Sequence, residues 1–158
     1  HNDLLDTINI TTNGALISHH ISKIEKLEKV KNINLSIDSL QRDKFAKITR
    51  RDVFPEVYKT FELLEKSSLN LKLNIVVQSG FNTDEILDFV RLTKNKNVAV
   101  RFIEEMPFNG KGQREMNENW TFKKILDQIK TEFYLSEIQS EKSSTSRNYS
   151  IKNHSCAV

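Results

Sequence analysis

Hydrophobic and polar residues alternate one by one in four short stretches of the chain. In residues 32–38, NINLSID, the side chains of Ile33, Leu35 and Ile37 fall on one face, and polar side chains occupy the other. The same alternation recurs at residues 7–12 (TINITT), 70–78 (NLKLNIVVQ) and 97–104 (NVAVRFIE). A period of two is typical of β-strands whose two faces meet different surroundings, so the pattern predicts four strands.

Apolar residues recur at intervals of three and four between and after these strands. They predict amphipathic helices at residues 15–30, 54–64, 83–93 and 120–133. The strand at 32–38 also runs into a helix that ends in the basic turn of Arg50 and Arg51, and Asp52 is suited to cap the helix that follows. Strands that alternate with helices indicate βαβ units and a parallel sheet.

The polar faces of the strands are unusual for a parallel sheet. Parallel strands that helices cover on both sides normally read as nearly continuous apolar runs. Three of the four strands here have a polar face, and the simplest arrangement pools those faces around one cavity. We therefore predict an arc of a (β/α) barrel with a site near the carboxyl ends of its strands. For the stretch 32–38 alone, an antiparallel strand with one wet face is the alternative.

Length and composition favour one compact domain that binds neither membrane nor nucleic acid. The chain has 158 residues, 37% of them hydrophobic and 28% charged, with no apolar run long enough to span a bilayer. Basic and acidic residues are interleaved, and the net charge is only +3, which is typical of a solvated surface. The single cysteine, Cys156, fits a reducing, cytoplasmic compartment. Because the chain opens at His1 and stops at Val158 within an apolar stretch, we expect a longer protein around it.

The sharpest candidate for chemistry is Lys72, whose ammonium points towards the predicted cavity. Such a charge needs a fixed partner, which is either an anionic ligand such as a phosphate or an internal carboxylate, Glu104 or Glu105. Thr11 and Ser36 are hydroxyl residues near strand ends, suited to bind a ribose or a base, although neighbouring backbone groups could satisfy them instead.

Other residue types point to no site. His19 and His20 are adjacent and face different directions, and Cys156 has no second cysteine near it, so no metal constellation is predicted. The chain contains neither a Walker loop nor a GxGxxG fingerprint. The basic residues within 42–51 could meet phosphates, but a solvated helix face is the commoner explanation.

Six motifs, in order and spacing, resemble one known family. They are TTNG at 11–14, NLSIDSL at 34–40, KFAKITRRDVF at 44–54, LKLNIVV at 71–77, DEILDFV at 84–90 and VRFIEEMPFNG at 100–110. The family that they resemble is molybdenum cofactor biosynthesis protein A, the GTP 3′,8-cyclases of the radical S-adenosylmethionine (radical SAM) superfamily.

The resemblance implies an α/β fold of the radical SAM type, an incomplete (β/α) barrel. Residues 1–106 would supply about its last four strands with their covering helices, and residues 107–158 would begin a small C-terminal extension. The implied enzyme converts GTP to (8S)-3′,8-cyclo-7,8-dihydroguanosine 5′-triphosphate, the first step of molybdenum cofactor (molybdopterin) biosynthesis. S-adenosyl-L-methionine and two 4Fe-4S clusters would be its cofactors.

The same resemblance implies four site residues. Thr11 of TTNG and Lys72 of LKLN would bind GTP, while Ser36 of NLSID and Met106 after RFIEE would border S-adenosylmethionine. The family's cluster ligands, an N-terminal Cys-x3-Cys-x2-Cys and three cysteines near the carboxyl end, are missing here, and Cys156 matches none of them. We therefore expect an interior fragment that is inactive alone, with no catalytic or metal-binding residue of its own.

The family also implies partners, and other readings stay open. A full-length enzyme would be a homodimer, and cyclic pyranopterin monophosphate synthase would act next in the pathway. One alternative is a radical SAM enzyme with another substrate. A second is a remnant that binds a nucleotide without catalysis.

Overall fold

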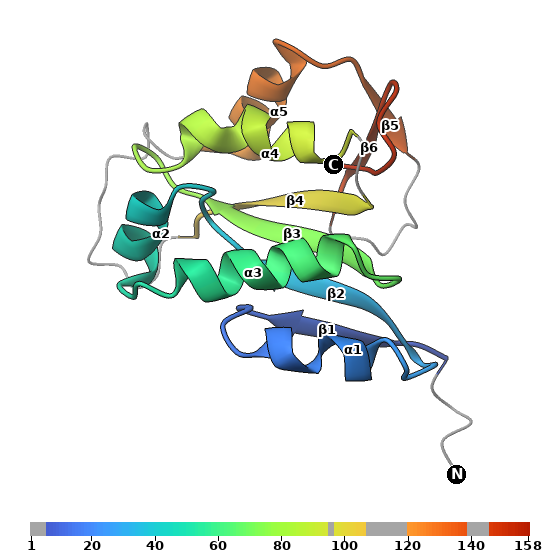
Figure 1. The fold of residues 1–158 in the computed structure, drawn as a ribbon. Coiled ribbons are helices and arrows are strands. Elements are labelled where there is room, and N and C mark those ends of the chain that lie inside the picture. The colour runs from blue at the N-terminus through green and yellow to red at the C-terminus, as the bar shows by residue number, and fades with distance from the viewer. Residues whose placement is uncertain (1–5, 95–96, 107–119, 139–145) are drawn as a thin grey trace.

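The computed structural model describes residues 6–94, 97–106, 120–138 and 146–158 (Figure 1). Its strands are β1 (Ile8–Thr12), β2 (Val30–Ser36), β3 (Asn70–Val77), β4 (Val98–Glu104), β5 (Leu135–Ile138) and β6 (Asn148–Ile151). Its helices are α1 (Ile21–Ile24), α2 (Arg42–Thr49), α3 (Phe54–Glu65), α4 (Ile86–Leu92) and α5 (Phe122–Lys130), with short 3-10 helices η1 (Ile17–His20) and η2 (Thr83–Glu85). The alternation of strands and helices is as predicted.

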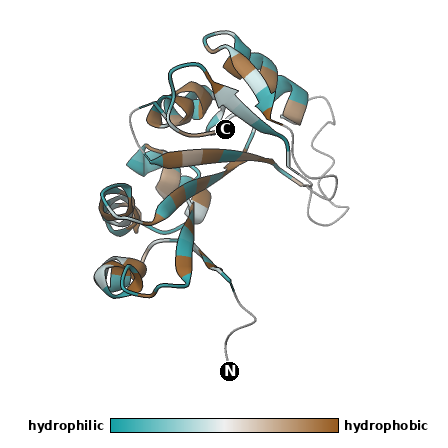
Figure 2. Ribbon diagram, turned by 90° about the vertical axis from the view of Figure 1, so that its right-hand side faces the viewer, coloured by the Kyte–Doolittle hydropathy of each residue, from teal (hydrophilic) through white to brown (hydrophobic). Residues whose placement is uncertain are grey.

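The first four strands form one parallel sheet in the order β1, β2, β3, β4. Figures 1 and 2 show α1, α3 and α4 together on one side of this sheet. The opposite side stays open along β1, β2 and β3 within the described part of the chain. The predicted α/β class and parallel sheet are therefore confirmed, and the antiparallel alternative for residues 32–38 is wrong.

The core lies between the sheet and its helices. Alternate strand residues such as Ile33, Leu35 and Leu73 are fully buried there, against Phe61 of α3 and Phe89 of α4. Each side chain of this size contributes about 1.5–3 kcal/mol when it is fully buried. This burial determines which face of each strand packs against the helices, and it leaves the polar face on the other side.

A second apolar cluster attaches the C-terminal part of the chain. Ile125 and Ile129 of α5 pack with Ile151 of β6 against Ile86 and Val90 of α4. Strands β5 and β6 pair in antiparallel fashion. Residues 107–119, where the predicted C-terminal extension would begin, lie outside the described residues.

The helix predicted at residues 15–30 is much shorter in the structure. Only η1 and the single turn of α1 form, and Leu27, which the apolar pattern placed against the sheet, is exposed. A helix of 16 residues would span about 24 Å. The five-residue strand β1 spans only about 17 Å, so such a helix would overshoot the start of the parallel strand β2.

The predicted cap at Asp52 is also wrong. Val53 is the N-cap residue of α3, and no side chain caps that helix. Asp52 instead accepts two hydrogen bonds from the Arg42 guanidinium, at 2.9 and 2.7 Å. A paired fork of this kind is charge-assisted and therefore outcompetes a neutral backbone donor.

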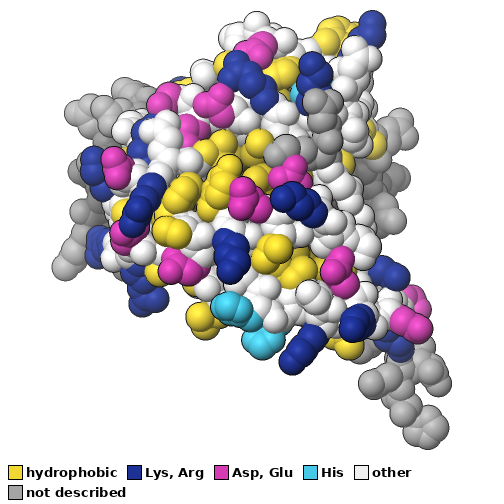
Figure 3. Space-filling model, viewed as in Figure 1, with side chains coloured by type: hydrophobic (Ala, Val, Ile, Leu, Met, Phe, Trp, Pro, Cys, Tyr) yellow, Lys and Arg dark blue, Asp and Glu magenta, His cyan; other side chains and the backbone are white. Residues whose placement is uncertain are grey.

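The helix-covered side of the molecule carries a mixed surface. Figure 3 shows Lys and Arg interspersed with Asp and Glu over this side, and apolar side chains between the helices. Within the described ranges, no helix is both long and apolar enough to cross a membrane.

Candidate functional site

The polar sides of the four parallel strands form one surface, the inner face, which lies opposite the helices (Figure 2). Their register arranges its residues in rows across the sheet. From the amino towards the carboxyl ends, the lower row is Asn9, Asn32 and Asn70, the middle row is Thr11, Asn34, Lys72 and Ala99, and the upper row is Ser36, Asn74 and Arg101. The alternation predicted that Thr11, Lys72 and Ser36 share a cavity. In the structure they lie on one surface, in adjacent rows.

The lower row satisfies its own hydrogen bonds. Asn32 Nδ2 donates to Asn9 Oδ1 at 2.6 Å, and Asn70 Nδ2 donates to Asn32 Oδ1 at 3.0 Å. A chain of amides links three strands in this way and leaves less capacity for a ligand. We therefore interpret the lower row as a structural layer beneath the site.

The middle row brings Thr11 and Lys72 close to the same asparagine. Thr11 Oγ1 accepts a hydrogen bond from Asn34 Nδ2 at 3.2 Å, and Lys72 follows Asn34 in the row. Within the described ranges, Lys72 forms no ion pair with Glu104 or Glu105. Glu104 accepts a hydrogen bond from the Phe122 backbone N–H at 2.7 Å instead. The predicted alternative of an internal ion pair with these two carboxylates is therefore wrong.

The charge on Lys72 is disfavoured where it lies. Burial of the ammonium lowers the pKa of Lys72, and the positive charge of Arg101 lowers it further. An anion bound between Lys72 and Arg101 would reverse the second effect, because an opposite charge favours the protonated amine. The inner face therefore has the electrostatics of an anion site.

The upper row has unsatisfied polar groups. Asn74 Oδ1 is buried and has no hydrogen-bond partner among the described residues. Neither the Ser36 hydroxyl nor the Arg101 guanidinium has a side-chain partner among the residues that the structure describes. Since a buried carbonyl without a partner costs about 1–3 kcal/mol, Asn74 suits a ligand that supplies an N–H or O–H donor. The Ser36 hydroxyl, the Asn74 amide oxygen and the Arg101 guanidinium thus lie in the row that follows Lys72 towards the carboxyl ends of the strands.

Asp38 extends the inner face beyond the upper row. Its Oδ1 accepts a hydrogen bond from the Val76 backbone N–H at 2.8 Å. Burial raises the pKa of the Asp38 carboxyl, and the bond from Val76 opposes this shift only in part. Asp38 therefore adds a half-buried acid to the carboxyl ends of β2 and β3.

Sequence reasoning placed some of these residues and missed others. Asn74, Arg101 and Asp38 were not singled out, although the same alternation that selected Ser36 and Lys72 puts them on the inner face. Met106 is two residues beyond β4, is 68% exposed and belongs to none of the rows. The structure thus brings three of the four predicted site residues onto one surface and leaves Met106 apart from them.

A cavity of about 710 Å³ adjoins the inner face at β4. Lys72 and Arg101 line it on one side, and α5 and β6 line it on the other. Arg147, whose guanidinium lies 5.1 Å above the centre of the Phe122 ring, adds a third cation. The volume lies within the usual range for ligand pockets, about 300–1,000 Å³.

The basic residues within 42–51 are engaged in part by neighbouring acids. Arg42 pairs with Asp52, and Lys44 Nζ lies 2.7 Å from Asp84 Oδ2 and 3.3 Å from Glu85 Oε1. These two cations therefore stabilise the fold of the helix side and are not on the inner face.

The side chains of this chain do not fit an iron–sulfur cluster. Cluster irons are held mainly by cysteine thiolates, and Cys156 is the only cysteine in the sequence. Its Sγ lies 3.8 Å from Asn97 Oδ1, and burial raises the pKa of the thiol, which disfavours the thiolate. Within the described ranges, no group of three or more His, Cys, Asp and Glu residues could hold a metal ion.

Comparison of the sequence with known proteins indicates one superfamily. The model of the radical SAM superfamily matches residues 2–93. Molybdenum cofactor biosynthesis protein moc-5 of Caenorhabditis elegans is 48% identical over 103 residues, which is 65% of this chain and 17% of that protein. Molybdenum cofactor biosynthesis protein 1 of Dictyostelium discoideum is 38% identical over 152 residues, which is 94% of this chain and 22% of that protein.

A third relative is similar over about two thirds of this chain. GTP 3′,8-cyclase of Chlorobaculum tepidum is 43% identical over 106 residues, which is 66% of this chain and 32% of that enzyme. The chain therefore spans about a third or less of the length of these three relatives. Because the superfamily model covers more than half of the residues, and the parallel sheet with its polar inner face agrees with it, this chain belongs to the radical SAM superfamily.

Proposed function

We propose that this chain is the interior part of a GTP 3′,8-cyclase and that its inner face is one wall of the active site. The enzyme would convert GTP to (8S)-3′,8-cyclo-7,8-dihydroguanosine 5′-triphosphate at the start of molybdenum cofactor biosynthesis. The similarity to GTP 3′,8-cyclase of Chlorobaculum tepidum over 66% of the chain supports this assignment.

The observation that carries the proposal is the contrast between the rows of the inner face. Asn9, Asn32 and Asn70 satisfy one another, whereas Lys72 and Asn74 lack polar partners in the described ranges. Polar groups that are left unsatisfied on the inside of a parallel sheet are typical of a ligand site.

The four predicted residues would have the roles that the family resemblance implies. Lys72 would bind the triphosphate of GTP, with Arg101 beside it to stabilise the same charge. Thr11, held by Asn34, would donate its hydroxyl hydrogen to the nucleotide. Ser36 would bind the ribose of S-adenosylmethionine, and Met106 would border that cofactor from the end of β4.

When bound, S-adenosylmethionine and an iron–sulfur cluster would supply the radical chemistry of the reaction. The residues of this chain would bind and orient S-adenosylmethionine and GTP. Asn74 Oδ1 is the acceptor that suits a donor of S-adenosylmethionine, since it is buried without a partner. The clusters themselves would be held by cysteines elsewhere in a longer protein.

The same proposal covers the architecture. Residues 1–106 would be the C-terminal part of an incomplete (β/α) barrel, and residues 107–158 the beginning of its extension. In the described part of the chain, β1 pairs only with β2, which leaves its other edge available for a preceding strand. The full-length protein would be a cytoplasmic homodimer whose product passes to cyclic pyranopterin monophosphate synthase.

Reading the coding DNA on both sides of this segment tests the fragment proposal. We expect Cys-x3-Cys-x2-Cys upstream and a Cys-x2-Cys with one more cysteine downstream. An open reading frame without both sets would exclude radical catalysis and leave only nucleotide binding.

Activity of the full-length protein tests the reaction. With reductant, S-adenosylmethionine and GTP, it should form 5′-deoxyadenosine and the cyclised nucleotide in equal amounts. Lys72→Ala should strongly weaken GTP binding, while Lys59→Ala, which removes an exposed lysine on α3, should leave it unchanged. Radical cleavage with a product from another substrate would instead support a different radical SAM reaction.

A further inference from the structure

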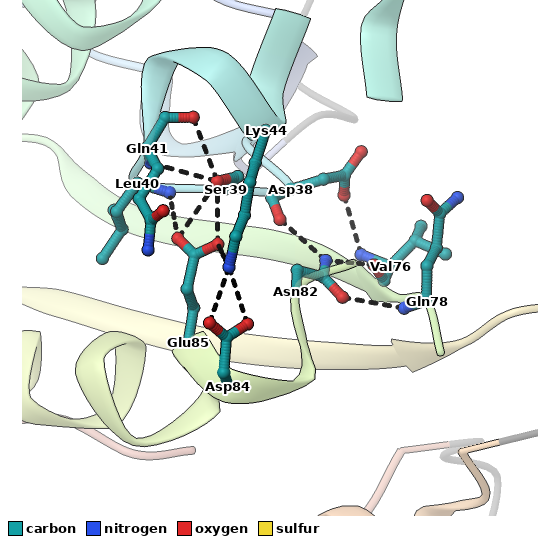
Figure 4. A network of polar contacts seen from close by, with 10 residues as sticks. All are labelled: Asp38, Ser39, Leu40, Gln41, Lys44, Val76, Gln78, Asn82, Asp84 and Glu85. Carbon is teal, nitrogen blue, oxygen red and sulfur yellow. Dashed lines mark hydrogen bonds and ion pairs between the residues drawn. The ribbon is translucent and has the colours of Figure 1, made fainter. Parts of the chain in front are cut away.

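Glu85 is a buried carboxylate that the proposed reaction does not use. Its side chain is 1% exposed, at the junction of η2 and α4. It accepts hydrogen bonds from Ser39 Oγ at 2.9 and 3.1 Å and from the Leu40 backbone N–H at 2.7 Å (Figure 4). Both donors belong to the loop between β2 and α2, which is 45 or 46 residues away in the chain.

The charge of Glu85 is balanced by a lysine. Lys44 Nζ, on the first turn of α2, lies 3.3 Å from Glu85 Oε1 and also binds both oxygens of Asp84 at 2.7 Å. Figure 4 shows Lys44 reaching across to both acids from the neighbouring helix. A charge this deeply buried is tolerated only when it is paired and hydrogen-bonded, as it is here.

A second set of contacts holds the same loop from the side of β3. Asn82 Nδ2 donates to the carbonyl oxygens of Asp38, at 2.7 Å, and of Val76, at 2.9 Å. Asn82 Oδ1 accepts from the Gln78 backbone N–H at 2.8 Å, and Asp38 Oδ1 accepts from the Val76 N–H. The segment after β2 is thus anchored to β3 at Asp38 and to α4 at Ser39 and Leu40.

The anchored segment begins directly after Ser36. Ser36 ends β2, and the next backbone N–H, that of Ile37, donates to the Asn74 carbonyl oxygen at 3.1 Å. Ser36 is therefore followed by four residues whose positions are set by contacts to β3 and α4. A ligand-binding side chain is most effective when neighbouring contacts determine its position beforehand.

Stability alone does not explain a carboxylate at this place. The neighbouring interior is apolar, with Ile86 and Phe89 of α4 fully buried beside it in the sequence. A buried ion pair is often no more stabilising than hydrophobic residues of the same volume, whereas it does select one arrangement of its partners. The contacts of Glu85 select one arrangement of the loop after Ser36.

We propose that Glu85 is a positioning residue, which holds residues 37–40 so that Ser36 meets S-adenosylmethionine in the correct geometry. This inference rests on the proposed function, since it concerns the ligand assigned to Ser36. It adds a role for Glu85, Ser39 and Lys44, which lie behind the inner face and touch no ligand.

Equilibrium binding to the full-length, cluster-loaded protein tests the inference without measuring turnover. Glu85→Gln should weaken S-adenosylmethionine binding about three- to tenfold, the effect of one lost or misplaced hydrogen bond, and leave GTP binding unchanged. Asp88→Asn is the matched control, an acid-to-amide change on the same helix at a residue 52% exposed, and should change neither affinity. Ser39→Ala removes the hydroxyl that donates to Glu85. It should also weaken S-adenosylmethionine binding and leave GTP binding unchanged.

A double-mutant cycle separates positioning from general loosening of the fold. If Glu85 acts through Ser36, then Glu85→Gln should cause no further loss in a Ser36→Ala background. Equal weakening of S-adenosylmethionine and GTP, or full additivity of the two changes, would overturn the inference and leave the proposed function intact. A wild-type protein that binds no S-adenosylmethionine would overturn both.

Discussion

Thr60 Oγ1 donates a hydrogen bond to the carbonyl oxygen of Gly14 across 2.6 Å. Thr60 lies in the middle of α3 and is fully buried, and Gly14 ends the TTNG turn that follows β1. The bond therefore connects a core helix to the turn three residues after Thr11. A change that breaks this hydrogen bond should therefore also disturb Thr11, for which we propose a contact with GTP.

Removing this hydroxyl should destabilise the protein although the side-chain shape is kept. Thr60→Val leaves the Gly14 carbonyl without its buried partner, so we expect a loss of about 1–3 kcal/mol. Thr131→Val is the control, since Thr131 Oγ1 also donates to a carbonyl, that of Gln128, but at an exposed site. A lower unfolding midpoint for Thr60→Val alone, measured on the full-length protein, would agree with this expectation. Equal midpoints for both variants would contradict it.

The two glycines in the left-handed region provide a matched comparison. Gly14 has φ +79° and Gly80 has φ +74°, so alanine is strained at both. A Cβ on Gly14 would lie 2.6 Å from Leu35 Cδ1, whereas a Cβ on Gly80 would meet nothing within 4 Å. Gly80→Ala should therefore cost only the backbone strain, about 1 kcal/mol, and Gly14→Ala should cost clearly more. Thermal unfolding of the two variants measures the difference, and a similar loss in both would mean that Leu35 moves aside freely.

Asp38 allows charge and hydrogen bonding to be separated. Asp38→Asn keeps an oxygen that can accept from Val76 and removes a charge that burial disfavours, so stability at neutral pH should stay equal or rise. Asp38→Ala removes the acceptor and should cost about 1–3 kcal/mol.

The pH dependence of stability at Asp38 has a definite sign. Because the folded pKa of Asp38 is raised, the folded protein binds more protons than the unfolded chain above the ordinary carboxyl pKa. Wild-type stability should therefore fall, relative to Asp38→Asn, as the pH rises from about 4 through the folded pKa. Unfolding midpoints of the two proteins across this range measure the effect, and parallel curves would contradict it.

GTP binding should be coupled to protonation of Lys72. Its lowered pKa leaves part of the amine neutral at alkaline pH, and the triphosphate should restore the charge. Binding heats measured at alkaline pH, below the ordinary pKa of lysine, in two buffers of different ionisation enthalpy should reveal uptake of a fraction of a proton. The uptake should vanish in Lys72→Met and persist in Lys59→Met. Release of protons, or uptake that survives in Lys72→Met, would count against this role of Lys72.

In the ligand-free protein, the ionisation of Lys72 should change stability with pH in the opposite direction to that of Asp38. Between the folded and the unfolded pKa of Lys72, the unfolded chain binds more protons than the folded protein. Stability should therefore rise with pH through that window, and the rise should be absent in Lys72→Met.

Much of the fold follows from local patterns. Alternation with a period of two places Leu35 and Ser36 on opposite faces of β2 whatever surrounds them, because successive side chains of a strand point in opposite directions. The inward positions of Thr11, Ser36 and Lys72 were predictable for this reason, and so was the parallel sheet, because helical stretches separate the strands.

The length of the first helix and the cap at Asp52 were not predictable from local pattern. Both depend on contacts between distant parts of the chain. The first helix must fit the distance between the end of β1 and the start of β2 beside it. Asp52 does not cap α3 because its carboxylate accepts hydrogen bonds from the Arg42 guanidinium. Local propensity cannot include partners that are brought near only by folding.

The amino-acid sequence by itself thus determined the class of fold, the faces of the strands and three residues of the inner face. Only the tertiary structure decided the rows of that face and the burial of Glu85 beneath the loop after β2. It also decided that Asn74 Oδ1 and the Lys72 ammonium have no polar partner in the part of the chain that is described. Register and burial are set by how distant segments pack, and the cost of an unsatisfied or buried polar group exists only once water has been excluded from it.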